Sequence, residues 1–459
     1  MTMEKCRESN HPLYLQIYEY YKNLIVLGRL KPGEKLPSIR RCALEREVSK
    51  TTIESSYMQL AAEGYIEALP GSGYYVSEGG FNTKGGQKIS PYQEADVKKM
   101  KPIYDFASGN VDYKSFNFDL WKRYMKSALR NTERLVAYGD PQGEYDLRVV
   151  LMNYVKEARG VVCSPEQIVV GAGVQSMLGI LCSLTGKRSP ICFTGNTFKQ
   201  GKAIFEDRGF ETYYKREVND LSYFKENKVK MLYTFPSHMS MWGEVMSMKT
   251  RMALLDFAQK EDCLIIEDDY DSEFRYYTRP VPSLQSLDGG QKVVYIGSFS
   301  RLLLPSLRIA FMVLPVELME TYREKGHLYN QTASTAEQIA LCQFIRDGHL
   351  RKQIKKTRKL YMNKSQELCT VIKEVFGSQA NAVSRGGGFL VRFEVDSPLS
   401  AEELARKADQ VGVRLKVSDY LNDKGWPCLL LSCSGVNEKD FEGAMLILKK
   451  EFLDTRGHT

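Results

Sequence analysis

The sequence predicts a multidomain chain in which a small α+β module precedes a larger α/β domain, and three observations support this prediction. The chain has 459 residues, about three times the size of an average domain. A polar stretch with four Gly and two Pro at residues 78–102 interrupts the periodic apolar pattern. Beyond it, apolar strand-like runs alternate with helical stretches, which is typical of a parallel-rich sheet covered by helices. We therefore expect a first domain at 1–77, a flexible linker at 78–102 and a second domain at 103–459.

Composition indicates a globular chain and excludes several classes of protein. Apolar residues make up 43% of the chain, whereas disordered chains are poor in them. The sequence has no run of 18 apolar residues and no leader-like start, so we expect a cytoplasmic protein without a membrane partner. The ten Cys contain no CxxC pair and the five His no HExxH motif, which predicts reduced core thiols and no metal site.

Three predicted helices and a hairpin organise the first domain. Apolar residues at positions 17, 21, 24 and 25 predict a helix that begins after Pro12. Ser38 and Ser49 can cap two further helices, which the short turn EVS joins into a helix-turn-helix. The segments YIEAL, PGSG and YYVS predict a strand, a turn and a strand, and this β-hairpin would form a wing. Periodicity alone fits a small helical packing domain equally well.

The start of the third predicted helix offers groups suited to DNA. Hydroxyls, an ammonium and free backbone N–H groups in a first helical turn can bind phosphates and base edges. The candidate DNA-binding residues are Arg40, Ser49, Lys50, Thr51, Thr52 and, at the hairpin tip, Gly71. The net charge of +8 permits a nucleic-acid partner, but residues 1–77 hold five Lys and five Arg against nine Glu, so charge does not demand one.

Residues 12–76 resemble, almost without a gap, the winged helix-turn-helix of GntR-type regulators. In that family the arginine of an LPSxR segment and the basic residue of a VSRxT segment commonly contact DNA. The resemblance implies that Arg40 and Lys50 contact a double-stranded DNA operator. It also implies that Thr52 contacts a phosphate or a base and that Gly71 lies at the wing.

Four segments of the second domain resemble fold-type I aminotransferases, and specifically the aminotransferase-like half of the MocR/GabR regulators. They are AYGDPQGEYDLR (137–148), VVGAGVQSML (169–178), CLIIEDDYDSEFRY (263–276) and YIGSFSRLLLPSLRIAFMVLP (295–315). Four long motifs in the family's order are far more specific than a single glycine-rich loop. The predicted fold of this domain is therefore α/β and fold-type I aminotransferase-like, and the resemblance implies pyridoxal phosphate as cofactor.

One group of candidate residues is suited to the phosphate of such a cofactor. Gly173, Val174 and Gln175 open a helix after a strand, so their N–H groups can bind a phosphate at the positive end of the helix dipole. Ser298 and Arg308 can add a hydroxyl and a guanidinium.

Two further residues are assigned to the cofactor ring. The resemblance implies that Asp268 lies under the pyridine nitrogen and keeps it protonated, and that Tyr270 donates to the ring hydroxyl. Spacing alone fits an acidic strand end beside a buried aromatic residue better.

Arg301 departs from the family in a way that matters for chemistry. It stands where the family has its Schiff-base lysine, directly after Ser300. Because arginine stays protonated, it is no practical nucleophile. We therefore predict no catalytic residue and no transamination, with pyridoxal phosphate held non-covalently or absent.

Other departures lie in the same predicted pocket. Leu430 replaces an arginine that clamps the substrate carboxylate in the family, so no charged partner is expected there. The turn SHMSMWG (237–243) brings in Met and Trp side chains and is expected to make the pocket bulkier. Phe198 replaces a tyrosine.

Three hypotheses about function follow. The first is a sequence-specific transcriptional regulator, homodimeric by family resemblance, whose second domain senses a small-molecule effector. The second is a working pyridoxal-phosphate-dependent aminotransferase with an appended DNA-binding module, which Arg301 disfavours. The third keeps the regulator but gives it another ligand, or none. The basic run at 349–364 predicts an amphipathic helix whose charged face is either solvated or in contact with DNA.

Overall fold

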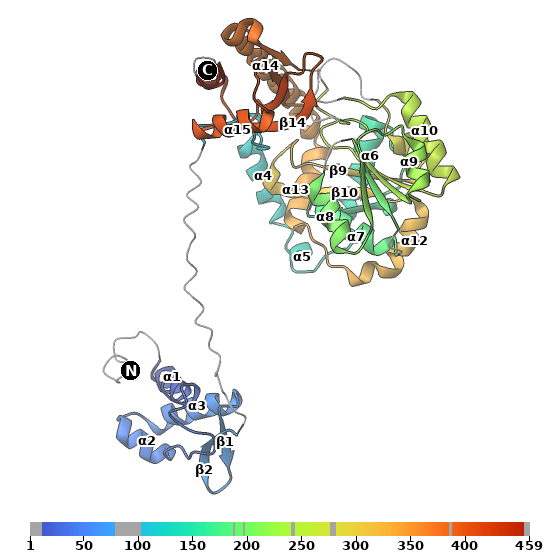
Figure 1. Ribbon diagram of the computed structural model, residues 1–459. Coiled ribbons are helices and arrows are strands. Elements are labelled where there is room, and N and C mark those ends of the chain that lie inside the picture. Colours follow the sequence, from blue (N-terminus) through green and yellow to red (C-terminus); the bar gives the residue numbers. More distant parts are fainter. Residues whose placement is uncertain are drawn as a thin grey trace. The chain divides into compact units, whose positions relative to one another are not determined.

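The protein forms two compact units in a computed structural model (Figure 1). The described residues are 12–78, 102–186, 189–195, 198–239, 244–275, 281–384 and 388–453. The predicted linker at 78–102 lies outside them apart from its two end residues. We describe each unit by itself.

The first unit is a helix-turn-helix followed by a β-hairpin, as the sequence predicts. Its elements are α1 (Leu13–Val26), α2 (Ile39–Arg46), α3 (Lys50–Ala62), β1 (Ile66–Leu69) and β2 (Gly73–Val76). The two strands pair antiparallel, with Ile66 opposite Val76. Both predicted caps form, since the Ser38 and Ser49 hydroxyls accept hydrogen bonds from the backbone N–H groups of Arg41 and Thr52. Ile17, Tyr21 and residues of α3 are buried together in one core.

The second unit is built on a seven-stranded sheet. In spatial order its strands are β4 (Ile168–Gly171), β10 (Ala310–Val313), β9 (Val293–Ser298), β8 (Leu264–Asp268), β7 (Met231–Thr234), β5 (Ile191–Thr194) and β6 (Thr212–Lys215). The strands from β9 to β6 run parallel, and β10 runs antiparallel to both of its neighbours. The predicted parallel-rich α/β sheet is therefore confirmed.

Helices cover both faces of this sheet, because its strands are apolar on both sides. One face packs against α7 (Val174–Leu184), α8 (Lys199–Asp207) and α12 (Val316–Lys325). The other packs against α6 (Tyr145–Arg159), α9 (Leu221–Glu226), α10 (Met248–Lys260), α11 (Leu284–Asp288) and α13 (Thr335–Arg346).

A smaller antiparallel sheet follows, in the order β11 (Ala380–Val383), β12 (Leu390–Val395), β15 (Pro427–Ser432) and β14 (Lys416–Leu421). The remaining elements are β3 (Tyr104–Asp105), α4 (Phe118–Ala128), α5 (Thr132–Leu135), α14 (His349–Phe376), α15 (Ala401–Gln410), β13 (Val413–Arg414) and α16 (Phe441–Leu453). The predicted amphipathic helix is the start of α14, where Leu350 and Tyr361 are buried.

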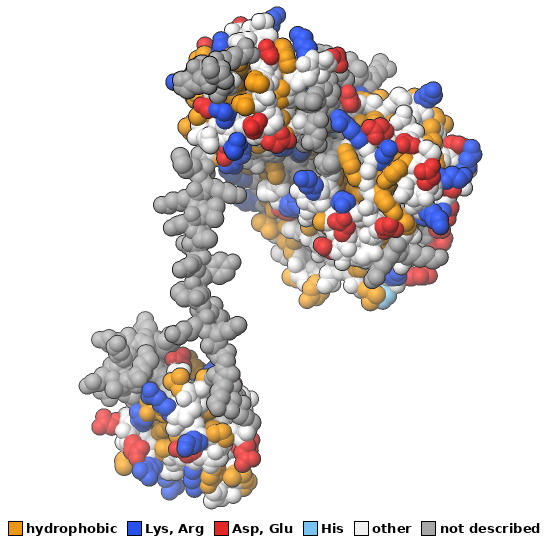
Figure 2. Space-filling view, viewed as in Figure 1, with side chains coloured by type: hydrophobic (Ala, Val, Ile, Leu, Met, Phe, Trp, Pro, Cys, Tyr) orange, Lys and Arg blue, Asp and Glu red, His pale blue; other side chains and the backbone are white. Residues whose placement is uncertain are grey.

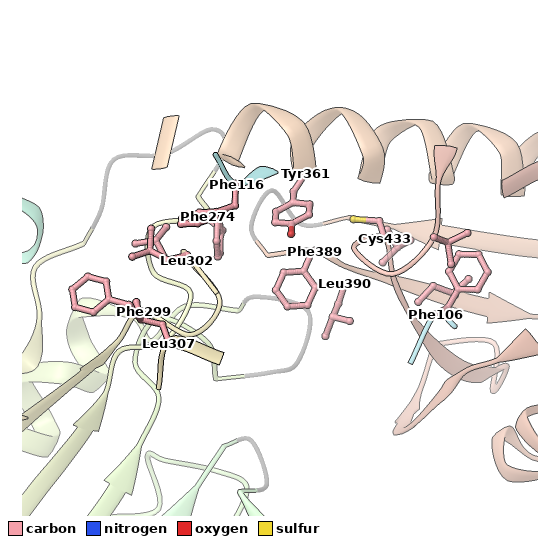
Figure 3. Packing of buried hydrophobic residues seen from close by; sticks show 14 of the residues in the cluster. Phe106, Phe116, Phe274, Phe299, Leu302, Leu307, Tyr361, Phe389, Leu390 and Cys433 are labelled. Atoms are coloured by element: carbon pink, nitrogen blue, oxygen red, sulfur yellow. The ribbon is translucent and has the colours of Figure 1, made fainter. Parts of the chain in front are cut away.

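An aromatic cluster joins the two sheets of the second unit, close to the candidate site. Tyr361 of α14 points toward Phe389, and their ring centroids lie 5.7 Å apart (Figure 3). Phe274 packs against both rings, at 5.7 Å from Tyr361 and 6.4 Å from Phe389. Since Phe274 follows β8 and Phe389 precedes β12, this packing fixes the small sheet against the carboxyl ends of the large one.

Candidate functional site

The candidate DNA-binding residues of the helix-turn-helix gather at the start of α3. Lys50 is exposed as the first helical residue. The Ser49 hydroxyl caps the helix and lies 2.8 Å from the Thr51 hydroxyl and 2.7 Å from that of Thr52. These hydroxyls stabilise the helix start and keep its exposed end in one conformation, which suits a contact with phosphate or base. Their contact with DNA remains a prediction.

The other two candidates, Arg40 and Gly71, lie on α2 and at the tip of the hairpin. Arg40 is exposed on α2, and no described side chain is bound to it, whereas the adjacent Arg41 pairs with Glu45 at 2.7 Å. Gly71 has φ of 75° at the hairpin tip, with no atom within 4 Å of a Cβ built there, so the wing tip is open. On the face drawn in Figure 2, Lys and Arg side chains gather at the end of this unit near α2 and the hairpin.

The second unit contains a cavity of about 680 Å³ at the carboxyl ends of β8 and β9. Ligands of α/β sheets bind at such strand ends. Of the seven predicted cofactor-binding residues, six line this cavity: Val174, Gln175, Asp268, Tyr270, Ser298 and Arg308. The seventh, Gly173, lies directly behind Arg308.

Five of these residues form what we call the cup: Gly173, Val174, Gln175, Ser298 and Arg308. Gly173 has φ of 86° and caps α7, whose first N–H groups therefore have no intrahelical partner. A Cβ at Gly173 would lie 2.6 Å from Arg308 Nη2, so the guanidinium lies against the helix start and would have to shift to admit a larger residue there. Arg308 itself has φ of 49°, a strained backbone for a non-glycine residue. The cup thus concentrates positive charge and backbone donors at one point.

Asp268 ends β8 beside the cup and is 6% exposed. The Tyr233 hydroxyl donates a hydrogen bond of 2.7 Å to its Oδ2. Burial raises the pKa of Asp268 to about 7, against the opposing effect of the Tyr233 hydrogen bond. Near neutral pH this carboxyl can therefore either hold or accept a proton.

The surroundings of the next residue, Asp269, shift its pKa in the opposite direction. Arg159 binds it with both Nε, at 2.6 Å, and Nη2, at 3.0 Å, and the Tyr295 hydroxyl donates to it at 2.7 Å. Burial opposes ionisation, but Arg159 and these hydrogen bonds outweigh it and lower the pKa of Asp269. Asp269 is thus a structural anchor, and Asp268 is the carboxyl that faces the cavity.

Arg301 lines the cavity where the family's lysine would stand. Its Nη1 donates to Asp271, and its guanidinium carbon lies 5.4 Å from the Tyr270 ring centroid and 4.8 Å from that of Phe389. Burial lowers the pKa of Arg301, but the Asp271 carboxylate more than offsets this, so the pKa stays above its ordinary value. Arg301 remains a cation under all ordinary conditions.

The sequence analysis assigned no role to several residues that line the cavity, namely His238, Asp271, Glu273, Phe389 and Lys416. Asp271 and Glu273 lie in a motif that had been identified, and only their orientation was missing. No sequence motif pointed to Lys416, because it begins a strand of the small sheet and reaches the cavity only through the packing of the two sheets.

The environment of Leu430 was predicted wrongly, since a charged side chain does lie beside it. Leu430 is fully buried and is not among the residues that line the cavity, but Lys416 stands directly opposite it across β14 and β15. Phe198 does line the cavity. Met239 packs elsewhere, against the cluster under α10, so it does not narrow this cavity as expected; residues 240–243, with Met241 and Trp242, lie outside the described residues.

The comparisons with known proteins agree with this geometry. Residues 13–76 match the family "Bacterial regulatory proteins, gntR family", and residues 101–422 match "Aminotransferase class I and II". The chain is 36% identical over 447 residues to YdeL of Bacillus subtilis, an HTH-type transcriptional regulator, covering 95% of this chain and 96% of YdeL. It is 28% identical to MocR of Rhizobium meliloti, a probable rhizopine catabolism regulatory protein, covering 97% of this chain and 95% of MocR. The chain belongs to the MocR/GabR-type family of transcriptional regulators.

The second unit of this MocR-type regulator has the fold of solved aminotransferases. An archaeal alanine:glyoxylate aminotransferase matches with a TM-score of 0.67 and 21% identity, covering 76% of this chain and 91% of that one. The kynurenine aminotransferase of Pyrococcus horikoshii matches with a TM-score of 0.66 and 18% identity, covering 79% and 93%. At this identity the likeness establishes the fold, which is fold-type I, and nothing about activity.

The described residues of the regulator form neither a metal-binding cluster nor a membrane-spanning helix. Within the described ranges, no three His, Cys, Asp or Glu side chains are grouped so that they could hold a metal ion. None of the helices in the described part of the chain is long and apolar enough to span a membrane.

Proposed function

We propose that this MocR-type regulator binds an operator through Arg40, Ser49, Lys50, Thr51, Thr52 and Gly71, and that its second unit senses a small-molecule effector without transaminating it. The family supports DNA binding as such. The observation that carries the finer proposal is the cavity, in which a complete cup and a buried Asp268 occur together with Arg301 in place of a nucleophilic lysine.

The cavity residues fit pyridoxal phosphate as a non-covalently held group. The cup supplies helix N–H groups, a hydroxyl and a guanidinium, which suit a phosphate dianion. Asp268 would bind the ring nitrogen, and Tyr270 would donate to the ring hydroxyl. Two buried polar atoms near the cavity, His238 Nδ1 and Asp271 Oδ1, have no hydrogen-bond partner among the described residues, which favours a polar ligand. When bound with a lysine, pyridoxal phosphate supplies an electron sink for amine chemistry.

Arg301 prevents the covalent part of that chemistry. A guanidinium that is ion-paired with Asp271 and lies near two aromatic rings does not give up its proton, so it cannot attack an aldehyde. Arg301 would instead orient the ligand through charge and hydrogen bonds. The domain would act as a sensor because a ligand that binds one dimer arrangement more tightly shifts the population toward it.

A homodimer is the form in which we expect the regulator to bind paired operator half-sites. Two large apolar side chains near the YGDP segment favour a protein partner, since Val136 is 87% exposed and Tyr138 is 94% exposed. We propose the cytoplasm, where DNA is accessible, as the site of action.

A titration of the full chain with pyridoxal phosphate tests the sensor proposal, followed by visible absorbance, borohydride reduction and intact mass. Saturable binding without a mass increase after reduction is the expected result. Arg301→Lys is the matched variant, and it should gain a reducible adduct. A stable adduct in the wild-type chain would show that another lysine reacts and would overturn the proposal.

A further inference from the structure

Two cations reach the cavity from different sheets: Arg301 stands at the position of the family's lysine, and Lys416 lies outside the four family motifs. Arg301 follows β9 of the large sheet, and Lys416 begins β14 of the small sheet. Both line the same cavity. Burial lowers the pKa of Lys416, and the positive charge of Arg301 lowers it further, against the opposing effect of Asp105. The positive charges of Arg301 and Lys416 therefore repel one another.

We propose that Arg301 and Lys416 together bind a carboxylate, and that the effector is a phosphorylated carboxylic acid with its phosphate in the cup. This inference rests on the proposed function in one respect, because it takes the cup as the phosphate site. The proposed effector carries a carboxylate where pyridoxal phosphate carries its aldehyde. This group would lie at the position that a lysine at 301 would face.

Arg301 is held in place in a way that suits a carboxylate. Its ion pair with Asp271 and its contacts with the Tyr270 and Phe389 rings fix the guanidinium before any ligand arrives. Arginine has five N–H donors, and among the described residues Arg301 donates a side-chain hydrogen bond to Asp271 only. The remaining donors can bind a planar carboxylate, which is the group that guanidinium geometry matches.

Lys416 supplies the second positive charge from across the strand pair. It stands in register with Leu430, and residues directly opposite one another in antiparallel strands project to the same face. No hydrogen bond or ion pair links its ammonium to any residue that the structure describes. The position that the family gives to a carboxylate-binding arginine is apolar here, and two cations stand opposite it in register, Lys416 on β14 and Arg392 on β12. Arg392 forms an ion pair with Glu394 and does not line the cavity, so Lys416 is the one that faces a ligand there.

The charge balance of the cavity points to an anionic ligand. Three cations line it, namely Arg301, Arg308 and Lys416. Asp271 is paired with Arg301. Burial raises the pKa of both Asp268 and Glu273 to about 7, so these carboxyls are only partly ionised at neutral pH. Positive charge is therefore in excess among the residues that line the cavity. Because an uncompensated cation in a buried site costs free energy, the cavity favours an anionic ligand.

Two probes that differ only at this position test the proposal: pyridoxal 5′-phosphate, which carries an aldehyde, and 4-pyridoxic acid 5′-phosphate, which carries a carboxylate. Isothermal titration of the full chain should give the acid an affinity roughly tenfold higher or more, the worth of charge-assisted hydrogen bonds. Lys416→Met should remove most of this preference while leaving the aldehyde's affinity little changed. Lys416→Arg should retain the preference, and Lys450→Met, an exposed lysine of α16, is the control.

The outcomes separate this inference from the proposed function. Equal affinities for the two probes, or a preference that survives Lys416→Met, would overturn the carboxylate site and leave the cup intact. Binding of neither probe by a chain with native circular dichroism would overturn both. A borohydride-reducible adduct of the aldehyde on Lys416 would also overturn the inference, because the amine would then bind covalently.

Discussion

At the scale of single residues, DNA recognition should depend on two exposed cations. Lys50→Ala or Arg40→Ala should weaken operator binding by about 1–3 kcal/mol where the side chain reads a base, and should weaken binding to all sequences alike where it contacts phosphate. Fluorescence anisotropy at one fixed salt concentration, with operator and scrambled DNA, distinguishes the two. Arg29→Ala, an exposed arginine after α1, is the control. Unchanged affinity of both variants would move the recognition surface elsewhere.

Gly173 provides a second test at this scale. A Cβ there would meet Arg308 Nη2 at 2.6 Å, on a backbone with φ of 86°. Gly173→Ala should therefore destabilise the second unit by about 1 kcal/mol or more and also weaken phosphate binding, because the guanidinium must move. Gly289→Ala is the matched control, since φ is 68° there and no atom lies within 4 Å. If both variants lose stability but both keep full affinity for pyridoxal phosphate, the cup is not the phosphate site.

At the scale of elements, two adjacent aspartates at the carboxyl end of β8 have different roles. Asp269 is a structural anchor, and Asp268 is the group that titrates. The pKa of Asp268 is about 7 in the folded chain, against about 3.9 for an unfolded aspartate. The folded state therefore holds this proton more tightly. The stabilisation from Asp268 is complete below about pH 4 and is lost as the pH rises through about 7.

The substitution Asp268→Asn should abolish this loss of folding stability at higher pH. The difference in free energy of unfolding between variant and wild type should change by on the order of 3 kcal/mol between pH 4.5 and pH 7.5, in favour of the variant at the higher pH. Tryptophan fluorescence during urea denaturation measures it, since all three Trp lie beyond residue 102. Asp207→Asn, exposed at the end of α8, should show no such trend. Parallel pH profiles for the wild type and Asp268→Asn would contradict the raised pKa.

Elements were also the scale at which the sequence was most informative. The helix caps at Ser38 and Ser49, the hairpin and the parallel-rich sheet followed from local rules of capping, turns and periodicity, and all of them are confirmed. The motif residues converge on one cavity because parallel strands end at the same edge. Lys416 could not be predicted, because it reaches the cavity through the packing of a second sheet, which no local pattern encodes. The roles of the site residues remain predictions.

At the scale of the whole molecule, the proposed homodimer can be tested at Tyr138. Tyr138→Glu would place a charge on an apolar surface and should weaken self-association, shifting the chain toward monomer in sedimentation velocity. Binding to DNA with two half-sites should lose affinity, while binding to a single half-site should change little. Val316→Glu, exposed at the start of α12, is the control. A dimer unaffected by Tyr138→Glu would place the interface elsewhere.

A segment next to the cavity is held by a buried arginine that donates its hydrogen bonds to main-chain carbonyl oxygens. Arg251 is fully buried, and its guanidinium donates to the carbonyl oxygens of Met246, Pro282 and Pro236 at 3.1, 2.9 and 2.9 Å. Two of these carbonyls, those of Pro236 and Met246, flank the segment that carries His238 to the cavity. Ser237 in the same segment is held separately, since its hydroxyl donates to Asp269 at 2.8 Å and accepts from Arg159 at 2.7 Å. A substitution at His238 could therefore change which effector the cavity accepts while both of these anchors stay in place.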